Sequence, residues 1–339
     1  MHRLHFILGL WLLLCCSDTS RAEDTGLEKA DHENASQWVQ TTVNGYLIKA
    51  HYLPAKQPDL PSPAVLLVAG SGATDHNGNN LAMGLHNNSY QMLAAALQQA
   101  GYAVLRPDKR GVGQSRATDH DPAAVRFDHH VKDVVAWIQF LRQHHTDITV
   151  IGHSLGGLMA MQAMRQEPVN RLVALASVAD SAHATVKRQM QNQPEFVRQA
   201  ALPLLDRLAQ GETIPGSEVP VFLHPLLGPD TQGYLQSFMQ LEPRSALQDL
   251  YIPTLVLVGD HDIQIAVPET QQMAAGLPHV RLQVIAGMNH VLKAAPAERM
   301  ANMATYAEPE RPLHADLMPA LLAFLPTVHD NHAPSPPSP

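Results

Sequence analysis

The chain has 339 residues, of which 45% are hydrophobic, and it contains two cysteines, 26 prolines and 20 histidines. This composition excludes collagen-like, disordered and disulfide-dense proteins. Lys and Arg number 23 against 31 for Asp and Glu, so the net charge is −8, and we expect no nucleic-acid partner. A chain of this length can bury a large core, either as one α/β domain with an insertion or as two domains.

Residues 1–22 are expected to form a signal peptide, because basic residues precede an apolar stretch, 6–16, that is too short to span a bilayer comfortably. Ser20-Arg21-Ala22 matches the small-x-small pattern of a cleavage site, which predicts export to the periplasm or the medium. An alternative is a lipoprotein anchored to the membrane at Cys16. Cleavage after Ala22 is favoured, since Cys15 stands where a lipoprotein box has a small residue. The mature chain then has no cysteine.

The elements that follow predict an α/β fold. Residues 38–52 read as a hairpin around the turn Asn44-Gly45. Short apolar runs typical of buried strands then recur at 64–69, 103–105, 148–151, 172–177, 254–258 and, more weakly, 281–285. Segments with helical periodicity lie between most of them, such as 90–100, 131–142 and 155–165. This alternation predicts a mostly parallel sheet with helices on both faces.

The alternation lapses in residues 181–250, where prolines interrupt helical pieces, and we interpret this segment as a helical cap inserted into the core. The core then comprises residues 37–180 and 251–326, and its final helix is expected at about 313–325. Residues 327–339 are rich in Pro, Ser, His and Asn, and are expected to be a disordered tail.

The strongest chemical signal is G-x-S-x-G at residues 152–156, which follows an apolar strand and precedes a helical segment. Small residues at Gly152 and Gly156 suit a sharp strand-to-helix turn that presents Ser154 as a nucleophile. His153 is expected to pack inside this turn and not to act as the base.

A serine nucleophile needs an imidazole as base and a carboxylate to orient that imidazole. Gly259-Asp260-His261-Asp262 follows an apolar strand, and the acid is assigned to Asp262 in preference to Asp260, because the acid lies in the loop beyond the strand. His290, in a loop after the next strand, is the candidate base. The chain order Ser, Asp, His is that of a known hydrolase arrangement.

The negative oxygen of a tetrahedral intermediate needs preorganised N–H donors. One is expected to be the backbone N–H of Leu155, and the second that of Ser71 in the loop Gly70-Ser71-Gly72-Ala73, with Gly72 as the alternative. The residues that a phosphate-binding loop requires do not follow these glycines.

Four stretches together resemble the α/β-hydrolase superfamily, and within it bacterial acyl esterases and serine-aminopeptidase-like hydrolases: residues 69–78, 106–115, the turn at Ser154, and 259–262 with 288–293. The resemblance implies that Asp262 and His290 complete a triad with Ser154, and that Asp108 to Ser115 form a structural turn beside the site. Ala69, Ala73 and His76 depart from residues common in similar esterases, which bears on substrate preference more than on the reaction.

The function expected is hydrolysis of short-chain carboxylic esters through an acyl-enzyme, with a small-molecule ester as the partner and no metal or other cofactor. A polar, Gln-rich cap argues against long acyl chains. A serine aminopeptidase is the alternative within catalysis. It would need a cap carboxylate for the substrate amine, and the candidates are Glu195, Asp206, Glu212, Glu218 and Asp230.

Two alternatives belong to other classes. The histidine count suggests an envelope metal-binding protein, but the pairs His129-His130 and His144-His145 lack metal-ligand spacing. A binding module without catalysis is the other, although loss of activity usually leaves a gap in the triad and the sequence has none.

Overall fold

A computed structural model of the chain describes residues 36–57, 61–117 and 121–328. The predicted signal peptide, both of its processing routes and residues 329–339 lie outside the described residues, and there the expectations stay predictions. Within the described part, no helix combines the length and apolar character needed to cross a bilayer.

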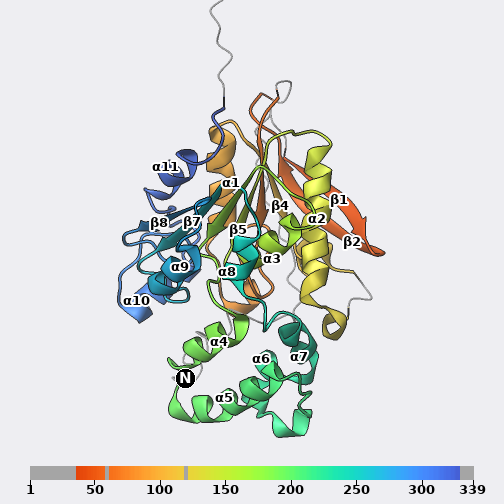
Figure 1. Ribbon diagram of the computed structural model, residues 1–339, viewed down its shortest axis with the longest axis vertical. Helices are drawn as coiled ribbons and strands as arrows, with labels where there is room; N and C mark the ends of the chain where they lie inside the picture. The colour runs from red at the N-terminus through yellow and green to blue at the C-terminus, as the bar shows by residue number, and fades with distance from the viewer. Residues whose placement is uncertain (1–35, 58–60, 118–120, 329–339) are drawn as a thin grey trace, which may run out of the picture.

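The core is an eight-stranded sheet, in which the strands follow the order β1-β2-β4-β3-β5-β6-β7-β8. The β1–β2 and β2–β4 pairs are antiparallel, and all other neighbours are parallel. The expected mostly parallel sheet is therefore confirmed (Figure 1). The strands are β1 (Gln37–Val43), β2 (Tyr46–Leu53), β3 (Ala64–Val68), β4 (Ala103–Pro107), β5 (Ile148–His153), β6 (Arg171–Leu175), β7 (Thr254–Gly259) and β8 (Val280–Ile285).

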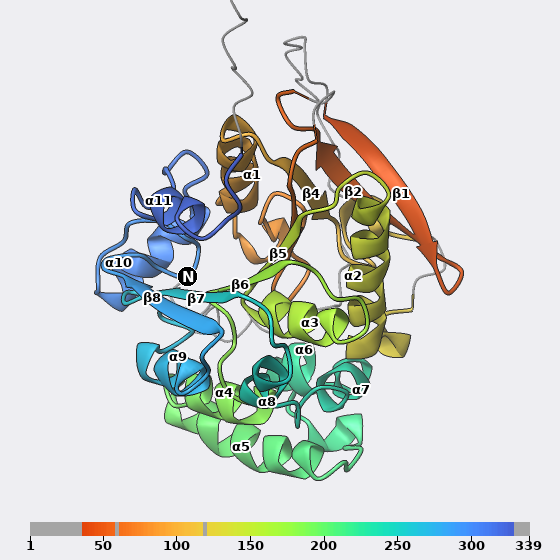
Figure 2. The same ribbon diagram turned by 45° about the horizontal axis from the view of Figure 1, so that its top comes forward.

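Helices cover both faces of the sheet. Successive strand residues point to opposite faces, and in the central strands the residues on both faces are apolar and buried. In β3, Leu66 and Val68 belong to one buried cluster, whereas Val65 and Leu67 belong to the other. Figure 2 shows α1 and α11 on one side and α2, α3, α8 and α9 on the other. The bounds are α1 (Ser89–Gln99), α2 (Phe127–Arg142), α3 (Leu155–Met164), α8 (Pro243–Gln248), α9 (Val267–Ala274), α10 (Arg299–Ala304) and α11 (Leu317–Leu322).

The two ends of the sheet explain the weaker sequence patterns. At one end, β1 and β2 form the expected hairpin, in which Asn44 and Gly45 have φ values of 50° and 81°. At the other end, β8 has only one neighbour, so most of its residues are at least partly exposed. An edge strand of this kind needs no continuous apolar run, which is why 281–285 alternates.

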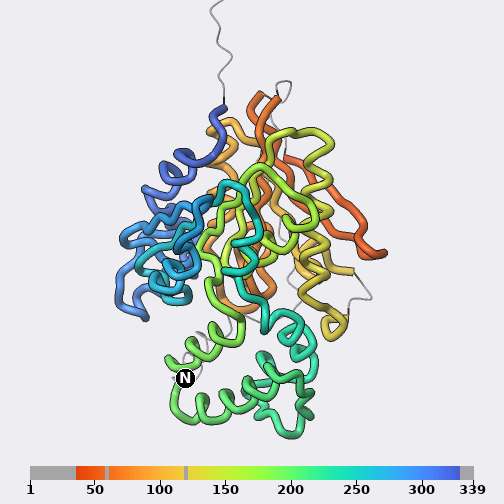
Figure 3. Tube along the Cα trace, in the orientation of Figure 1, coloured from red at the N-terminus to blue at the C-terminus, as the bar shows by residue number. Residues whose placement is uncertain are grey.

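The expected helical insertion joins β6 to β7. The chain leaves the sheet after β6 and returns at β7, as the green to teal tube in Figure 3 shows. Its last helix, α8, contacts α3 and α9, so this part of the segment packs in the helical layer on the sheet. The helices that project from the sheet are α4 (Ala182–Met190), α5 (Glu195–Ala209), α6 (His224–Leu227) and α7 (Pro229–Gln236), and we keep the name cap for α4–α7.

The C-terminal end differs from the prediction in two ways. The final helix, α11, is shorter than the expected 313–325. Val328 is half-buried against the cluster that contains α1, and it lies beside Gly101. The packed part of the chain therefore extends two residues beyond the expected boundary at residue 326.

Leu97 of α1 offers a test of this packing. It is fully buried in the cluster between α1, α11 and the sheet, whereas Leu81 is 60% exposed. We expect Leu97→Ala to lower the free energy of unfolding by about 2–5 kcal/mol, since it leaves a cavity. The matched variant Leu81→Ala should change it by less than about 0.5 kcal/mol. Urea unfolding followed by circular dichroism measures both, and equal effects would refute this view of the core.

Candidate active site

Ser154 occupies a strained turn between β5 and α3. Its φ of 54° is rare for a residue with a side chain, and α3 begins at the next residue. Glycines on either side make the turn possible: a Cβ on Gly152 would collide with the Gly156 carbonyl, and a Cβ on Gly156 would collide with the Val68 carbonyl of β3. The predicted reason for these glycines, close packing at the turn, matches this geometry.

His290 and Asp262 meet across the loops that follow β8 and β7. His290 Nδ1 lies 2.8 Å from Asp262 Oδ2, and the carboxylate is completely buried. The other carboxylate oxygen accepts hydrogen bonds from the backbone N–H groups of Gln264 and Ile265, at 2.8 and 2.9 Å. These donors stabilise the charged carboxylate, which in turn requires a proton on Nδ1 of His290 and leaves Nε2 as the basic nitrogen.

Asp260, the competing carboxylate, is placed elsewhere. Its Oδ1 accepts a hydrogen bond from the Gly287 N–H at 2.6 Å, and its side chain is 45% exposed. It therefore holds the loop after β8 from outside the site, and the carboxylate beside His290 is that of Asp262.

Two anchors that the sequence did not reveal fix the His290 loop. The fully buried Asn289 side chain donates to Asn302 of α10 and to Thr305, at 3.2 and 2.8 Å, and accepts from the Lys293 N–H. From the other side, Ser89 at the start of α1 donates its hydroxyl proton to the Val291 carbonyl at 2.6 Å. Asn289 lies in the stretch 288–293 singled out in the sequence and Ser89 lies in none of those stretches, but the role of each depends on contacts between distant segments.

His153 packs inside the turn, as expected, and also bonds to its surroundings. Its Nε2 lies 2.8 Å from the carbonyl oxygen of His290, which can only accept, so Nε2 carries the proton. Nδ1 then accepts from the Tyr90 hydroxyl at 2.7 Å. Burial, together with the nearby His290, lowers the pKa of His153 to about 3. A neutral His153 thus connects the Ser154 turn to the backbone of His290.

The loop after β3 lies directly against Ser154. A Cβ on Gly70 would stand 2.8 Å from the Ser154 Cβ. The Gly70 N–H donates to the Tyr90 hydroxyl at 3.4 Å, so it is not aimed at a substrate. Ser71, the expected second donor, is the next residue and lines the same pocket as Ser154.

Ser154, His290 and Ser71 share one pocket, which encloses about 490 Å³ including its mouth. Thr74, Asn80, Asn87, Ser89 and Gln264 also line it, whereas aliphatic side chains are few. The predicted nucleophile, base and oxyanion loop therefore meet in one cavity, whose lining mixes polar and apolar side chains.

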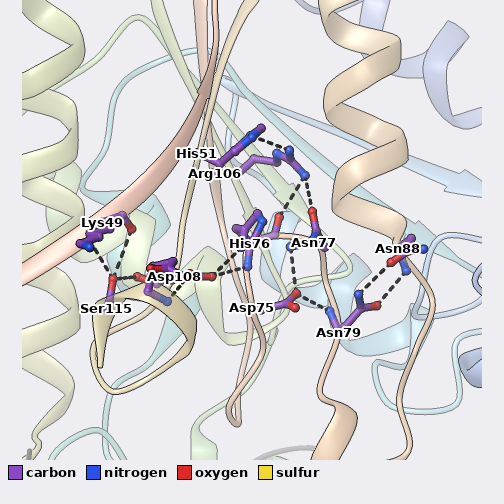
Figure 4. A network of polar contacts seen from close by, with 11 residues as sticks. Lys49, His51, Asp75, His76, Asn77, Asn79, Asn88, Arg106, Asp108 and Ser115 are labelled. Carbon is purple, nitrogen blue, oxygen red and sulfur yellow. Dashed lines mark hydrogen bonds and ion pairs between the residues drawn. The ribbon is translucent and has the colours of Figure 1, made fainter. Parts of the chain in front are cut away.

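A polar network joins the loop after β3 to neighbouring segments (Figure 4). The buried Asp108 carboxylate accepts from the backbone N–H and Nδ1 of His76, both at 2.8 Å, and from the Gln114 N–H. Ser115 closes the same turn by donating to the Asp108 carbonyl. His76, one of the departures from similar esterases, thus ties the loop after β3 to the turn after β4.

The remaining expectations concern metals and the cap. In the described ranges, no group of three or more His, Cys, Asp or Glu side chains is arranged to hold a metal ion. Of the cap carboxylates, Asp206 bonds to His183 and Lys187, while Glu212 and Glu218 bond to Arg207. None of the five lines the pocket of Ser154.

The buried His153 predicts a dependence of stability on pH. Above pH 6.5 its ring is neutral in both the folded and the unfolded chain. As the pH falls below 6.5, only the unfolded chain takes up the proton, so the free energy of unfolding should fall by up to about 1.4 kcal/mol per pH unit. His153→Asn should show a shallower decline between pH 6 and 4 than the wild type.

Urea unfolding at a series of pH values measures this slope. His144→Asn, which changes an exposed histidine, is the control and should keep the wild-type slope. Identical slopes in all three proteins would contradict a neutral, buried His153.

The chain is similar to known hydrolases in sequence. Residues 65–305 match the model of a family described as the alpha/beta hydrolase family. Esterase EstD of Thermotoga maritima is 24% identical over 305 residues, which cover 83% of this chain and 68% of that protein.

Solved structures show the same fold. Est1E from Butyrivibrio proteoclasticus, with bound ferulic acid, is 17% identical, with a TM-score of 0.51, and the match covers 80% of this chain and 96% of that chain. Proline iminopeptidase from Mycobacterium smegmatis is 16% identical, with a TM-score of 0.50, and the match covers 76% of this chain and 92% of that chain. The family match spans the parallel strands from Val65 of β3 to β8 and every pocket residue named above. The chain therefore belongs to the alpha/beta hydrolase family.

Proposed function

We propose that this protein is a serine hydrolase that cleaves short-chain carboxylic esters. The observation that carries the proposal is the hydrogen bond between His290 and the buried Asp262, in a pocket shared with the strained Ser154. Similarity to an esterase of Thermotoga maritima is consistent with this activity.

In the proposed mechanism, His290 Nε2 takes the proton of Ser154 while Oγ attacks the ester carbonyl carbon. The N–H groups of Ser71 and Leu155 stabilise the negative oxygen of the tetrahedral intermediate. Collapse of the intermediate breaks the bond to the alcohol, which leaves with the proton from His290. Water, deprotonated by the same imidazole, then attacks the acyl-enzyme and releases the carboxylic acid.

The small apolar surface that the pocket offers favours short acyl groups over long hydrocarbon chains. Burying a long chain stabilises a complex in proportion to the apolar surface that it covers, and among the described residues the aliphatic side chains that line this pocket are only those of Leu85, Val291 and Leu292. The peptidase alternative requires a carboxylate within reach of a substrate amine, and the cap carboxylates do not line this pocket.

A pair of neighbouring carboxylates tests the triad. Asp262→Asn should keep the hydrogen-bonding shape but allow the wrong tautomer of His290, and we expect kcat to fall by about 10⁴. Asp260→Asn, two residues away and outside the site, should keep kcat within about twofold of the wild type, because the Asn side-chain oxygen can still accept from the Gly287 N–H. The kcat for p-nitrophenyl acetate measures both, and a reversed order would assign the acid to Asp260.

A substrate panel tests the specificity. We expect turnover of p-nitrophenyl acetate and butyrate, little turnover of the palmitate, and none of aminoacyl p-nitroanilides. Ser154→Ala should abolish the activity while circular dichroism shows an intact fold. Hydrolysis of the anilides alone would establish the peptidase instead, and full activity of Ser154→Ala would reject the mechanism.

A further inference from the structure

The turn after β4 contacts the loop that carries the expected oxyanion donor. β3 and β4 are parallel neighbours, paired at Val65 and Val104 and at Leu66 and Leu105, so the loops that follow them emerge at the same edge of the sheet. Lys109, in the turn after β4, reaches across and donates its ammonium protons to the carbonyl oxygens of Gly70, at 2.5 Å, and of Gly72.

This contact determines the direction of a neighbouring N–H. The described peptide bonds are all trans, and in a trans peptide the N–H points opposite to the C=O. The Gly70 carbonyl and the Ser71 N–H belong to the same peptide unit. Since Lys109 holds the carbonyl, the Ser71 N–H points away from the ammonium.

That direction leads toward the pocket. Gly70 and Ser71 line the pocket of Ser154, whereas Lys109 is not among its lining residues. Lys109 therefore holds the loop from outside the pocket, and Gly70 lies so close to Ser154 that a Cβ on Gly70 would stand 2.8 Å from the Ser154 Cβ. The Ser71 hydroxyl oxygen is buried, without a hydrogen-bond partner in the described residues, and Ser71 itself does not tie the loop down through its side chain.

The other hydrogen bonds of this loop do not fix the orientation of the Gly70–Ser71 peptide unit, which therefore depends on Lys109. The Gly70 N–H is fixed by Tyr90, and the Ser71 carbonyl accepts from the Thr74 hydroxyl at 2.9 Å. Both lie on the adjoining peptide units. A cation on the carbonyl oxygen also polarises the peptide and strengthens its N–H as a donor.

We propose that Lys109 is a positioning residue for the oxyanion hole: its ammonium group orients and polarises the Gly70–Ser71 peptide, so that the Ser71 N–H stabilises the transition state. The inference rests on the proposed ester hydrolysis. It gives a role to one residue of the turn from Asp108 to Ser115, for which the sequence resemblance implied a structural role alone.

The test replaces the ammonium group while keeping the length of the stem. In Lys109→Met, we expect kcat to fall by about 10-fold to 100-fold with KM within about threefold, somewhat less than complete loss of an oxyanion donor. Concentrations are normalised by titrating active sites with a p-nitrophenyl phosphonate. Lys132→Met, at an exposed helix position, is the matched control and should behave as the wild type.

The order of three variants separates positioning from packing. Arginine keeps the charge and the donors, glutamine keeps a neutral donor, and methionine keeps only the stem, so kcat should decrease in the order Arg, Gln, Met. If Lys109 mattered only through packing of its stem, methionine would be the mildest change, and that result would overturn the proposal.

Two further measurements keep the inference apart from the proposed function. An alkylboronic acid, which forms a tetrahedral adduct on a serine, should lose affinity in Lys109→Met in proportion to the loss in kcat/KM. Hydrogen exchange of the peptide covering residues 69–77, which needs no activity, should become faster.

A wild-type protein without Ser154-dependent esterase activity would refute the proposed function, while the exchange rates would still decide whether Lys109 holds the loop. In an active enzyme, an unchanged kcat or unchanged exchange in Lys109→Met would overturn the inference about Lys109 alone.

Discussion

The site depends on the backbone conformation of Ser154. A positive φ at a residue with a side chain costs about 1–3 kcal/mol, and it persists only where the surroundings overdetermine it. Here β5 is buried between β3 and β6, and α3 starts immediately after the turn. Hydrogen bonds from the Ser154 N–H to the Leu175 carbonyl and from the Val178 N–H to the Ser154 carbonyl hold the strained peptide units.

The parallel sheet brings the other groups to this turn. The loops after β3, β4, β5, β7 and β8 all leave the carboxyl edge, which is where open parallel sheets place their sites. Each loop then needs its own restraint, because a loop alone would be mobile. Asn289 and Ser89 restrain the His290 loop, Asp108 restrains His76, and Lys109 binds the carbonyls beside Ser71.

Hydrogen bonds also connect these restraints to one another. The Gly70 N–H, the Tyr90 hydroxyl and His153 form a chain that ends at the carbonyl of His290. One neutral histidine thus joins the loop beside Ser71, the serine turn and the backbone of the base. Such a buried network is stabilising only when each donor and acceptor in it has a partner. A neutral imidazole meets this condition, because its acceptor nitrogen faces the Tyr90 hydroxyl and its N–H faces the His290 carbonyl.

The sequence alone determined the order of the elements, the mostly parallel sheet and the serine turn, because buried strands, helical periodicity and G-x-S-x-G are all local patterns. It also predicted His290 as the base and favoured Asp262 over Asp260 as the acid. Only the tertiary structure showed that Asp262 contacts His290 and that Asp260 contacts Gly287 instead, and only it showed what Asn289, Tyr90 and Lys109 bond to. Those contacts join segments far apart in the chain, and their residue types carry no local signature. The physical reason is that periodicity is a property of neighbouring residues in the chain, whereas the direction of a loop side chain or N–H group is set by how the loops pack against one another.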